Sequence, residues 1–387
     1  MSSGIDSEVD VAIVGGGIIG LSVAWRARAK GMSVTVLERD TIGRGTSHVA
    51  AGMLAPVAEV EFGDAGRALL ELGLRSAEMW PGFARALEVA SGGDEVGLRA
   101  TGTLVVARDE DQARELERQI VWRESLGLCT TRLRPSEARQ RESALAPTLR
   151  LAFEAPEDHS VDPRLVLAAL RRACEAAGVR LREHSPVARV ELDGVGARVM
   201  GVALRDGESY LARHVVIAAG AWSGHLQGLP SAACVPVRPV KGQILRLCDP
   251  AGPGLLERVV RFEGGYLVPR ADGRYVLGAT VEERGFERHA TAGGVYELLR
   301  DAHELLPGVS ELQIEELCVG LRPGTPDNVP VIGPGTLEGL TWATGHHRNG
   351  ILLAPLTAEL VVSALAGESQ RPFAAACRPD RFAAVPA

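Results

Sequence analysis

The chain has 387 residues, 46% of them hydrophobic and 24% charged, so it can bury a large core and is too long for one ordinary domain. Its net charge of −7, with both signs interspersed, leaves no basic surface and argues against a nucleic-acid partner. The longest uncharged apolar stretch, residues 11–25, is interrupted by glycines and is shorter than the roughly 18 residues of a membrane span, so we expect no such span.

A complete βαβ unit opens the chain. Residues 9–14 are typical of a short buried strand, residues 18–30 of a helix that ends at Gly31, and residues 33–37 of a second strand. Both strands are apolar runs without alternation, as in a parallel sheet that is covered on both faces. The unit therefore predicts an α/β fold.

A glycine-rich turn joins the first strand to the helix, with the spacing Gly15-x-Gly17-x-x-Gly20. Gly15 permits a tight turn, Gly17 lets backbone N–H groups approach a pyrophosphate, and Gly20 lets helix and strand pack closely. Glu38, at the end of the second strand, can accept the ribose hydroxyls and would repel the extra phosphate of NADP. The turn predicts dinucleotide binding, but it does not decide between FAD and NAD.

The remaining elements follow in chain order. We expect helices over residues 65–91, 109–126, 163–177, 293–306 and 351–366, and strands over residues 101–107, 179–191, 197–211, 214–219 and 341–343. Residues 235–280 are β-rich, with turns at Gly264-Gly265 and Asp272-Gly273. No linker separates these parts, which favours two domains with interleaved segments.

Four stretches of the chain resemble the FAD-dependent amine and amino-acid oxidase family: residues 11–20, 46–56, 320–327 and 345–355. The last two together are typical of its glycine-oxidase branch, which is linked to thiamine biosynthesis. The resemblance implies a p-hydroxybenzoate-hydroxylase-like α/β fold. In this fold a Rossmann-type FAD-binding domain is interleaved with a substrate domain that carries a large mixed or antiparallel sheet.

The same resemblance divides the chain. The FAD-binding domain is expected to comprise residues 1–80, 150–225 and 320–387, and the substrate domain residues 81–149 and 226–319. FAD is expected to be non-covalent, because Cys318 is out of register with the cysteine that carries flavin in some sarcosine oxidases. A buried core position is the ordinary interpretation of such a cysteine.

The FAD site is expected to draw on residues from both ends and the middle of the chain. The candidates are Gly15, Gly17, Ile18, Ile19, Gly20, Glu38, Arg39, Thr46, Ser47, Ala51, Gly52, Met53, Val187, Ala219, Gly220, Trp222, His347, Arg348, Asn349, Gly350, Ile351 and Leu352. The resemblance places residues 46–53 beside the flavin ring and the Val187 backbone at the adenine. From its small residues alone, 46–53 is equally compatible with an ordinary surface loop.

A helix starting near Gly350 is expected to direct its unpaired N–H groups toward flavin O2. Pro355 fits only near a helix start, which supports this placement. His346 and His347 are interpreted as residues of the flavin surroundings, because hydride transfer from a neutral amine needs no base.

Three residues are candidates for substrate binding and catalysis: Arg322, Tyr266 and Arg348. Arg322 lies in a Gly-Leu-Arg-Pro-Gly motif, and its guanidinium can bind a carboxylate through two hydrogen bonds. The resemblance places Tyr266 at the same carboxylate and Arg348 at the flavin edge. A surface arginine, a core tyrosine and an arginine at a helix cap remain the respective alternatives.

The expected function is oxidative deamination of glycine, or of a similar amino acid such as sarcosine or D-alanine, by hydride transfer to FAD. The products would be an imine or 2-oxo acid, ammonia and, with oxygen as acceptor, hydrogen peroxide. The glycine imine would supply thiamine thiazole synthesis. The alternatives are a D-amino-acid dehydrogenase that reduces a quinone and a non-catalytic flavin-binding subunit. The pocket size stays open, because residues 263–265 depart from the bulkier residues of the branch at this place.

The cysteines and the N-terminal residues indicate the compartment. The cysteines form no Cys-x-x-Cys pair and so indicate neither a zinc site nor a redox pair; they are Cys129, Cys174, Cys234, Cys248, Cys318 and Cys377. Asp6, Glu8 and Asp10 precede the first apolar run, where a secretory signal would carry Lys or Arg. We therefore expect a cytoplasmic protein without a metal site; a homo-oligomer is left open.

Overall fold

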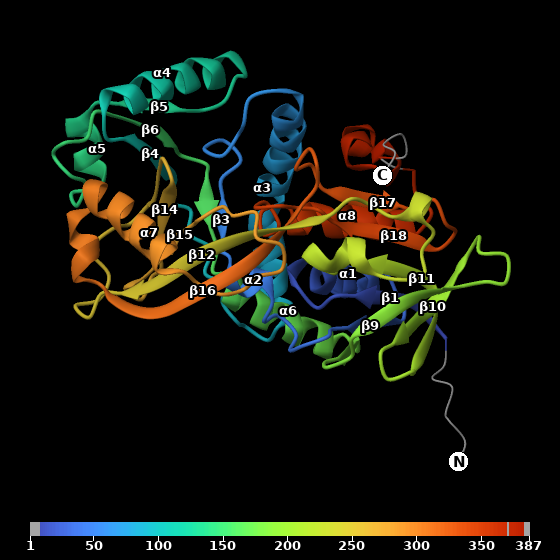
Figure 1. Cartoon of the computed structure of the whole chain (residues 1–387). Coiled ribbons are helices and arrows are strands. Elements are labelled where there is room, and N and C mark those ends of the chain that lie inside the picture. The colour runs from blue at the N-terminus through green and yellow to red at the C-terminus, as the bar shows by residue number, and fades with distance from the viewer. Residues whose placement is uncertain (1–7, 370, 383–387) are drawn as a thin grey trace.

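The computed structural model describes residues 8–369 and 371–382, and it contains two large β-sheets that lie beside each other (Figure 1). Asp6 and the outermost residues of the expected segments 1–80 and 320–387 lie outside the described residues. Within the described part, no helix has both the length and the apolar composition needed to cross a membrane.

The first sheet has the strand order β17-β18-β11-β1-β2-β8, with β10 and β9 extending from β11. Its strands are β1 (Val9–Val14), β2 (Val34–Leu37), β8 (Arg180–Arg182), β9 (Val187–Leu192), β10 (Val199–Leu204), β11 (Ser209–Ile217), β17 (Val331–Pro334) and β18 (Leu340–Thr344). β1 is parallel to both β2 and β11, and β11 is parallel to β18. The expected βαβ unit therefore forms the centre of this sheet.

Four helices share one hydrophobic core with β1 and β2: α1 (Ile18–Ala29), α3 (Asp64–Ala90), α6 (Pro163–Ala176) and α8 (Ala354–Leu365). α1 is buried almost all round, as expected for a helix enclosed by others. α6 begins as the sequence predicts, with the Asp162 side chain accepting from the N–H of Arg164 and Pro163 in the first turn. The opposite face of the sheet packs against β9 and β10.

The second sheet has the order β16-β12-β15-β14-β13-β4-β6-β5 and is mostly antiparallel, with β13 and β4 parallel. Its strands are β4 (Thr103–Ala107), β5 (Thr131–Leu133), β6 (Leu151–Ala155), β12 (Arg238–Cys248), β13 (Val259–Phe262), β14 (Gly265–Pro269), β15 (Arg274–Gly278) and β16 (Gln313–Gly324). β12 and β16 pair over their whole length and extend from this sheet toward the first (Figure 1).

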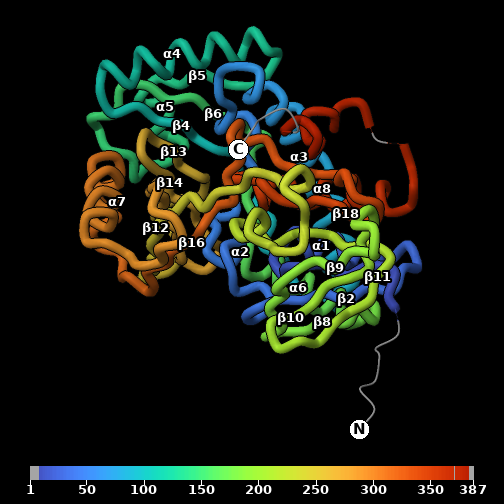
Figure 2. The backbone as a smooth tube through the Cα atoms, turned by 45° about the vertical axis from the view of Figure 1, so that its right-hand side comes forward, coloured from blue at the N-terminus to red at the C-terminus, as the bar shows by residue number. Residues whose placement is uncertain are grey.

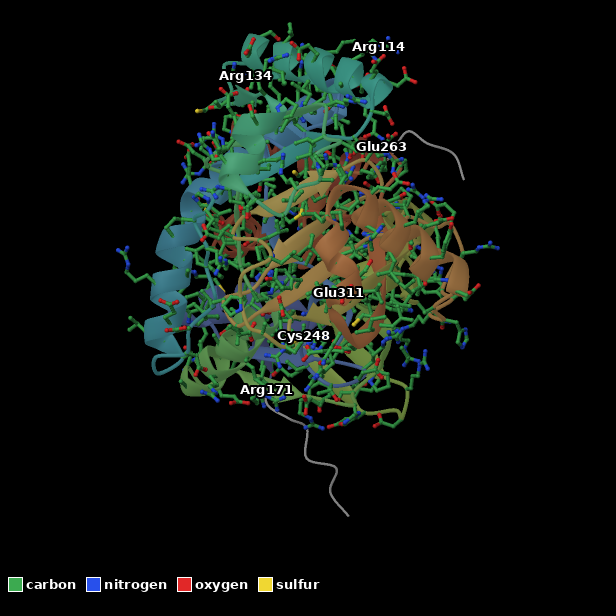
Figure 3. The ribbon with its side chains drawn as sticks, turned by 90° about the vertical axis from the view of Figure 1, so that its left-hand side faces the viewer. Arg114, Arg134, Arg171, Cys248, Glu263 and Glu311 are labelled. Atoms are coloured by element: carbon green, nitrogen blue, oxygen red, sulfur yellow. The ribbon has the colours of Figure 1, made fainter. Side chains whose placement is uncertain are left out.

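Helices cover the outer parts of the second sheet: α4 (Glu110–Ser125), α5 (Pro135–Arg141) and α7 (Ala292–Leu305). Arg114 on α4 and Arg134 beside α5 project outward from this end of the molecule (Figure 3). The described short 3-10 helices are η1 (Gly220–His225), η2 (Ser231–Ala233), η3 (Pro307–Glu311), η4 (Pro372–Cys377) and η5 (Pro379–Phe382).

Residues 46–54 lie between the two sheets, where α2 is also visible in Figure 2. They form the four-residue helix α2 (Thr46–Val49) and the short strand β3 (Met53–Leu54), which pairs with β7 (His159–Ser160). Residues 46–53 are therefore not an irregular loop throughout. The sequence signal for a helix of one turn is weak, because so short a helix depends on tertiary contacts.

Three other boundaries differ from the expectation. Residues 179–191 form two strands, because β8 pairs with β2 while β9 turns to pair with β10. Residues 209–217 form one continuous strand, which leaves β10 and then lies beside β1. The last helix begins at Ala354 and not near Gly350, because residues 350–353 form a turn first.

Strand pairing also bears on the domain edges. β6 belongs to the second sheet, although residues 150–225 were expected with the first. α3 is a single helix across the expected boundary at residue 80. We therefore keep the two interleaved domains as a proposal and place the start of the middle FAD-binding segment after Ala155.

Candidate functional site

One elongated cavity of about 570 Å³ extends from the glycine-rich turn after β1 to the second sheet. It is lined by residues of β1, the α2 segment, η1, β14, β16 and the turn before α8. These elements come from distant parts of the chain, and the packing of the two sheets brings them together.

The glycine-rich turn forms one end of the cavity. Gly15 has a φ of +112°, and a Cβ there would lie 2.4 Å from the carbonyl oxygen of Ala218 at the end of β11. A Cβ on Gly20 would lie 2.0 Å from the Gly15 carbonyl oxygen, so this residue allows α1 to pack on the turn and does not itself line the cavity. Both glycines are required by close backbone approach.

The N-terminus of α1 faces the cavity. Ile18 N donates to the Ser47 hydroxyl at 3.2 Å, while the described residues provide no hydrogen-bond acceptor for the N–H groups of Gly17 and Ile19. Unpaired N–H groups at the positive end of a helix bind anions such as a pyrophosphate. The turn therefore fits the phosphates of a dinucleotide.

The acidic residue at the end of β2 lies beside this turn. Glu38 accepts from Gly16 N at 2.8 Å and from Asp40 N at 3.0 Å, and it lines the cavity. The Arg39 guanidinium lies 3.5 Å from the ring centroid of Trp222 in a cation–π contact. Val187 lines the same end of the cavity. This end is shaped for the adenosine half of a dinucleotide.

The α2 segment is fixed by side chains of the second sheet. Arg246 donates to the carbonyl oxygen of His48 at 3.0 Å, and Arg270 donates to that of Ala51 at 2.6 Å. The Thr46 hydroxyl donates to the Leu321 carbonyl oxygen at 2.9 Å. Thr46, Ser47, Ala51, Gly52 and Met53 all line the cavity, so the structure places this segment at the site and not on an outer surface.

The turn before α8 presents backbone donors. Within the described residues, the N–H groups of Gly350, Ile351 and Leu352 have no hydrogen-bond acceptor, and Gly350 and Ile351 line the cavity. They can hold a carbonyl oxygen or an anion, as the sequence predicts for a helix start. These donors belong to the turn that precedes α8 and not to the helix itself. Asn349 and Leu352, which were also candidates for the FAD site, do not line the cavity.

Arg322 and Tyr266 approach each other over two strand glycines on the second sheet. A Cβ on Gly242 of β12 would lie 2.3 Å from Arg322 Nη1, and one on Gly278 of β15 would lie 2.6 Å from the Tyr266 hydroxyl. Both long side chains therefore lie flat against the sheet. Any residue other than glycine at position 242 or 278 would displace them. Glycine in a strand commonly marks such a close approach.

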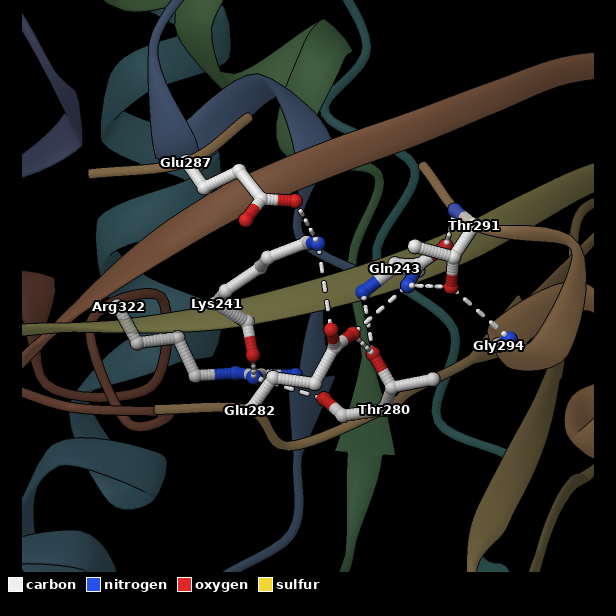
Figure 4. Close-up of polar contacts among 8 residues, drawn as sticks. All are labelled: Lys241, Gln243, Thr280, Glu282, Glu287, Thr291, Gly294 and Arg322. Carbon is white, nitrogen blue, oxygen red and sulfur yellow. Dashed lines mark hydrogen bonds and ion pairs between the residues drawn. The ribbon is translucent and has the colours of Figure 1, made fainter. Parts of the chain in front are cut away.

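Hydrogen bonds orient the Arg322 guanidinium (Figure 4). Its Nη1 donates to the carbonyl oxygens of Lys241 at 3.3 Å and Thr280 at 3.0 Å. Because Nη1 is used in this way, Nε and Nη2 form the edge that can bind a carboxylate through two hydrogen bonds. Burial raises the pKa of Tyr266, while the neighbouring Arg322 charge opposes this shift, so the hydroxyl keeps its proton and can donate.

Arg348 lines the cavity but forms an ion pair with Glu61. In the described structure the Arg322 guanidinium is hydrogen-bonded to backbone carbonyl oxygens, while that of Arg348 pairs with Glu61. Burial lowers the pKa of His346 to about 3 and, together with the Arg322 and Arg238 charges, lowers the pKa of His347 to about 4. The ring of His346 is also bonded to the Thr357 hydroxyl at 2.9 Å. Both histidines are therefore neutral near pH 7.

All the remaining candidate residues line the cavity: Ile18, Ala219, Gly220 and His347.

Sequence reasoning missed Arg261 and Glu59, which also line the cavity and lie 3.6 Å apart. Arg261 lies opposite Tyr266 in the β13–β14 hairpin, so the strand register was the available signal. No group of three or more metal-ligating residues occurs in the described part of the chain.

Comparisons with known proteins agree with this geometry. The model of the FAD dependent oxidoreductase family matches residues 10–364. The bifunctional protein ThiO/ThiG of Synechocystis sp. is 36% identical over 96% of this chain, which spans only 54% of that protein's length. Glycine oxidase of Geobacillus kaustophilus is also 36% identical, with 91% of each chain covered. The crystal structure of the Geobacillus glycine oxidase superposes with a TM-score of 0.89 at 33% identity, covering 97% of this chain and 99% of that one.

Proposed function

The chain belongs to the FAD-dependent oxidoreductase family, and on this premise we propose that it is an amino-acid oxidase acting on glycine or a similarly small amine such as sarcosine or D-alanine. The observation that carries the proposal is the pairing of Arg322 and Tyr266 in the cavity that the dinucleotide turn opens. A guanidinium edge and a neutral hydroxyl on the same wall are donors suited to a substrate carboxylate.

FAD is the family's cofactor, and the described residues fit it without a covalent link. The N–H groups of Gly17 and Ile19 would hold its pyrophosphate, and Glu38 its ribose. The donors of Gly350 and Ile351 would lie at the flavin O2. When bound, FAD supplies the acceptor for the hydride of the substrate α-carbon. Cys318 does not line the cavity, in agreement with a non-covalent cofactor.

The protein's own residues orient the substrate. With its carboxylate on Arg322 and Tyr266, a small amino acid has its α-carbon held at a fixed distance from the second sheet. This restriction converts binding energy into alignment of the reacting atoms. Because burial lowers the pKa of His346 to about 3 and that of His347 to about 4, both rings are weak proton acceptors near pH 7, which fits a substrate that reacts with a neutral amine.

The further steps of the proposal concern products and cellular role. Removal of two electrons from glycine gives its imine, water then gives the 2-oxo acid and ammonia, and oxygen takes up the electrons to give hydrogen peroxide. The similarity to ThiO/ThiG supports a role of the imine in thiamine thiazole synthesis. A cytoplasmic location is supported by six cysteines that are all unpaired in the structure.

The deciding experiment is anaerobic mixing of the purified yellow protein with glycine, sarcosine or D-alanine. The proposal predicts that at least one of them bleaches the flavin, and that air then restores the colour with release of peroxide. Bleaching without peroxide, restored only by a quinone, would indicate a dehydrogenase. No bleaching by any small amino acid would favour a non-catalytic flavin-binding subunit and contradict the proposal.

A further inference from the structure

The chain contains only two lysines, Lys30 and Lys241, whereas arginine supplies its other basic side chains. Lys30 is exposed at the end of α1, but the side chain of Lys241 on β12 is completely buried. We propose that Lys241 is a positioning residue, which holds residues 279–291 in the arrangement that orients Arg322 toward the substrate carboxylate. This inference extends the proposed function and rests on it for the identity of the substrate.

Two carboxylates of the 279–291 segment neutralise the buried ammonium (Figure 4). Lys241 Nζ lies 3.2 Å from Glu282 Oε2 and 3.3 Å from Glu287 Oε1. A buried ammonium is costly unless it is paired and hydrogen-bonded, so these contacts bind the segment to β12. Lysine offers a compact charge with three donors on a flexible stem, which suits two carboxylates that approach from different residues.

A set of hydrogen bonds extends from this ion pair to the start of α7. Glu282 accepts from the Thr280 hydroxyl at 2.6 Å and from Gln243 Nε2 at 2.7 Å. Gln243 also accepts from Thr291 N at 2.8 Å, and the Thr291 hydroxyl caps α7. Both ends of the 279–291 segment are therefore fixed to the same short stretch of β12.

The backbone of this stretch carries the effect to Arg322. Lys241 N donates to the Glu282 carbonyl oxygen at 2.9 Å, and Glu282 N donates to the Lys241 carbonyl oxygen at 3.0 Å. The carbonyl oxygens of Lys241 and Thr280 are also the acceptors of Arg322 Nη1. A shift of the 279–291 segment would therefore move one of the two acceptors that hold Arg322 Nη1.

The middle of the same segment reaches the dinucleotide-binding side. The ring of Phe286 lies 5.5 Å from that of Trp222 and 5.0 Å from that of His225, both on η1. Val281 and Arg288 line the cavity. The segment thus connects the two halves of the site, and Lys241 is its buried ionic anchor.

The test uses the FAD-loaded protein with Lys241→Met, which keeps the length of the stem and removes the charge. Binding of acetate, a carboxylate that cannot be oxidised as an amine, is followed without oxygen through the flavin difference spectrum. We expect the Kd for acetate and the KM for glycine to rise by roughly tenfold or more, since small misplacements of orienting groups have effects of this size. FAD content and kcat at saturating glycine should change much less.

Three further variants make the outcome decisive. Lys30→Met is the matched control and should behave like the unaltered protein. Lys241→Arg should restore part of the acetate affinity. Glu287→Gln, whose side chain is 44% exposed, removes one ion pair without burying an unpaired charge and should give a smaller rise in the same direction. It serves as the test if Lys241→Met does not fold.

The inference would be overturned if the folded, FAD-loaded variants bound acetate as tightly as the unaltered protein does. Loss of FAD content together with unchanged acetate affinity in the remaining holoenzyme would also overturn it, because that pattern indicates general stability alone. If none of glycine, sarcosine and D-alanine bleaches the flavin of the unaltered protein, the proposed function fails. The acetate measurement still reports on the role of Lys241 in that case.

Discussion

Gly242→Ala is the sharpest test of the way in which the second sheet holds Arg322. In the structure, a Cβ at this position would lie 2.3 Å from Nη1, 2.5 Å from Nη2 and 2.6 Å from Cζ of Arg322. Ordinary contact begins near 3.4 Å, so the guanidinium would have to move by about 1 Å. The methyl group therefore displaces the charged end and leaves the rest of the side chain in place.

The expected cost follows from the hydrogen bonds that this movement weakens. A hydrogen bond to a charged group contributes roughly 1.5–3 kcal/mol, and about 1.4 kcal/mol corresponds to a factor of ten. Loss of good geometry at the carboxylate should therefore lower kcat/KM for glycine by about ten- to a hundredfold. Most of the change should appear in KM, and the flavin spectrum should be retained. Steady-state peroxide formation at a series of glycine concentrations measures both parameters.

Two further variants are measured beside Gly242→Ala, one as a parallel test and one as a control. Gly278→Ala should also impair glycine oxidation, because its Cβ would lie 2.6 Å from the Tyr266 hydroxyl. Gly82→Ala in α3 is the control, since apart from its chain neighbours and the nearby backbone of its own helix no described atom lies within 4 Å of the added Cβ, and alanine is the better helix former. Unchanged KM in folded, FAD-loaded Gly242→Ala would show that Arg322 does not bind the substrate from its position in the structure.

Four other predictions concern the cofactor, the substrate carboxylate and pH. Arg322→Ala should lower kcat/KM for glycine about a hundredfold; Arg322→Lys should recover part, and equal losses with a carboxylate-free amine would contradict the assignment. Glu38→Ala should raise the Kd for FAD, measured by fluorescence titration, because the ribose hydroxyls lose their acceptor; an unchanged Kd would place the ribose elsewhere. Acid precipitation should release all flavin into the supernatant, whereas a yellow pellet would reveal a covalent bond. Burial lowers the pKa of His346 from 6.5 to about 3, so the unfolded chain binds the proton first and the free energy of unfolding falls as pH drops below 6.5. His346→Gln should remove a pH dependence on the order of 5 kcal/mol in urea unfolding between pH 6.5 and about 3, and an unchanged slope would contradict burial of the neutral ring.

The dinucleotide end was predictable from the sequence because its determinants are local. The turn from Gly15 to Gly20 and the acidic Glu38 lie within one βαβ unit, where spacing alone fixes their relative positions. The start of α6 followed equally well from its capping signal, because α6 begins at Pro163, as expected from Asp162. Tertiary contacts were not needed for these inferences.

The substrate end depends on contacts between distant strands. Nothing near Gly242 in the sequence shows that Arg322 will lie across it, because the pairing of β12 with β16 joins residues some eighty positions apart. The role of Lys241 was missed for the same reason, since its partners lie in a segment that returns to β12 only after β15. Arg261 becomes a cavity residue only through its register with Tyr266. The start of α8 was predicted too early in the sequence. The residues of the turn that precedes it, 350–353, have a composition that is also typical of the first turn of a helix.

The order of the strands in the first sheet has a consequence for synthesis on the ribosome. β1 and α1 are made more than three hundred residues before β18, which completes the parallel core beside β11, and before α8, which packs on α1. α6 can cover part of the apolar surface of α1 earlier, but the part that packs against α8 stays uncovered until α8 is made. The nascent chain should depend on chaperones during that interval and acquire flavin only after α8 has been released.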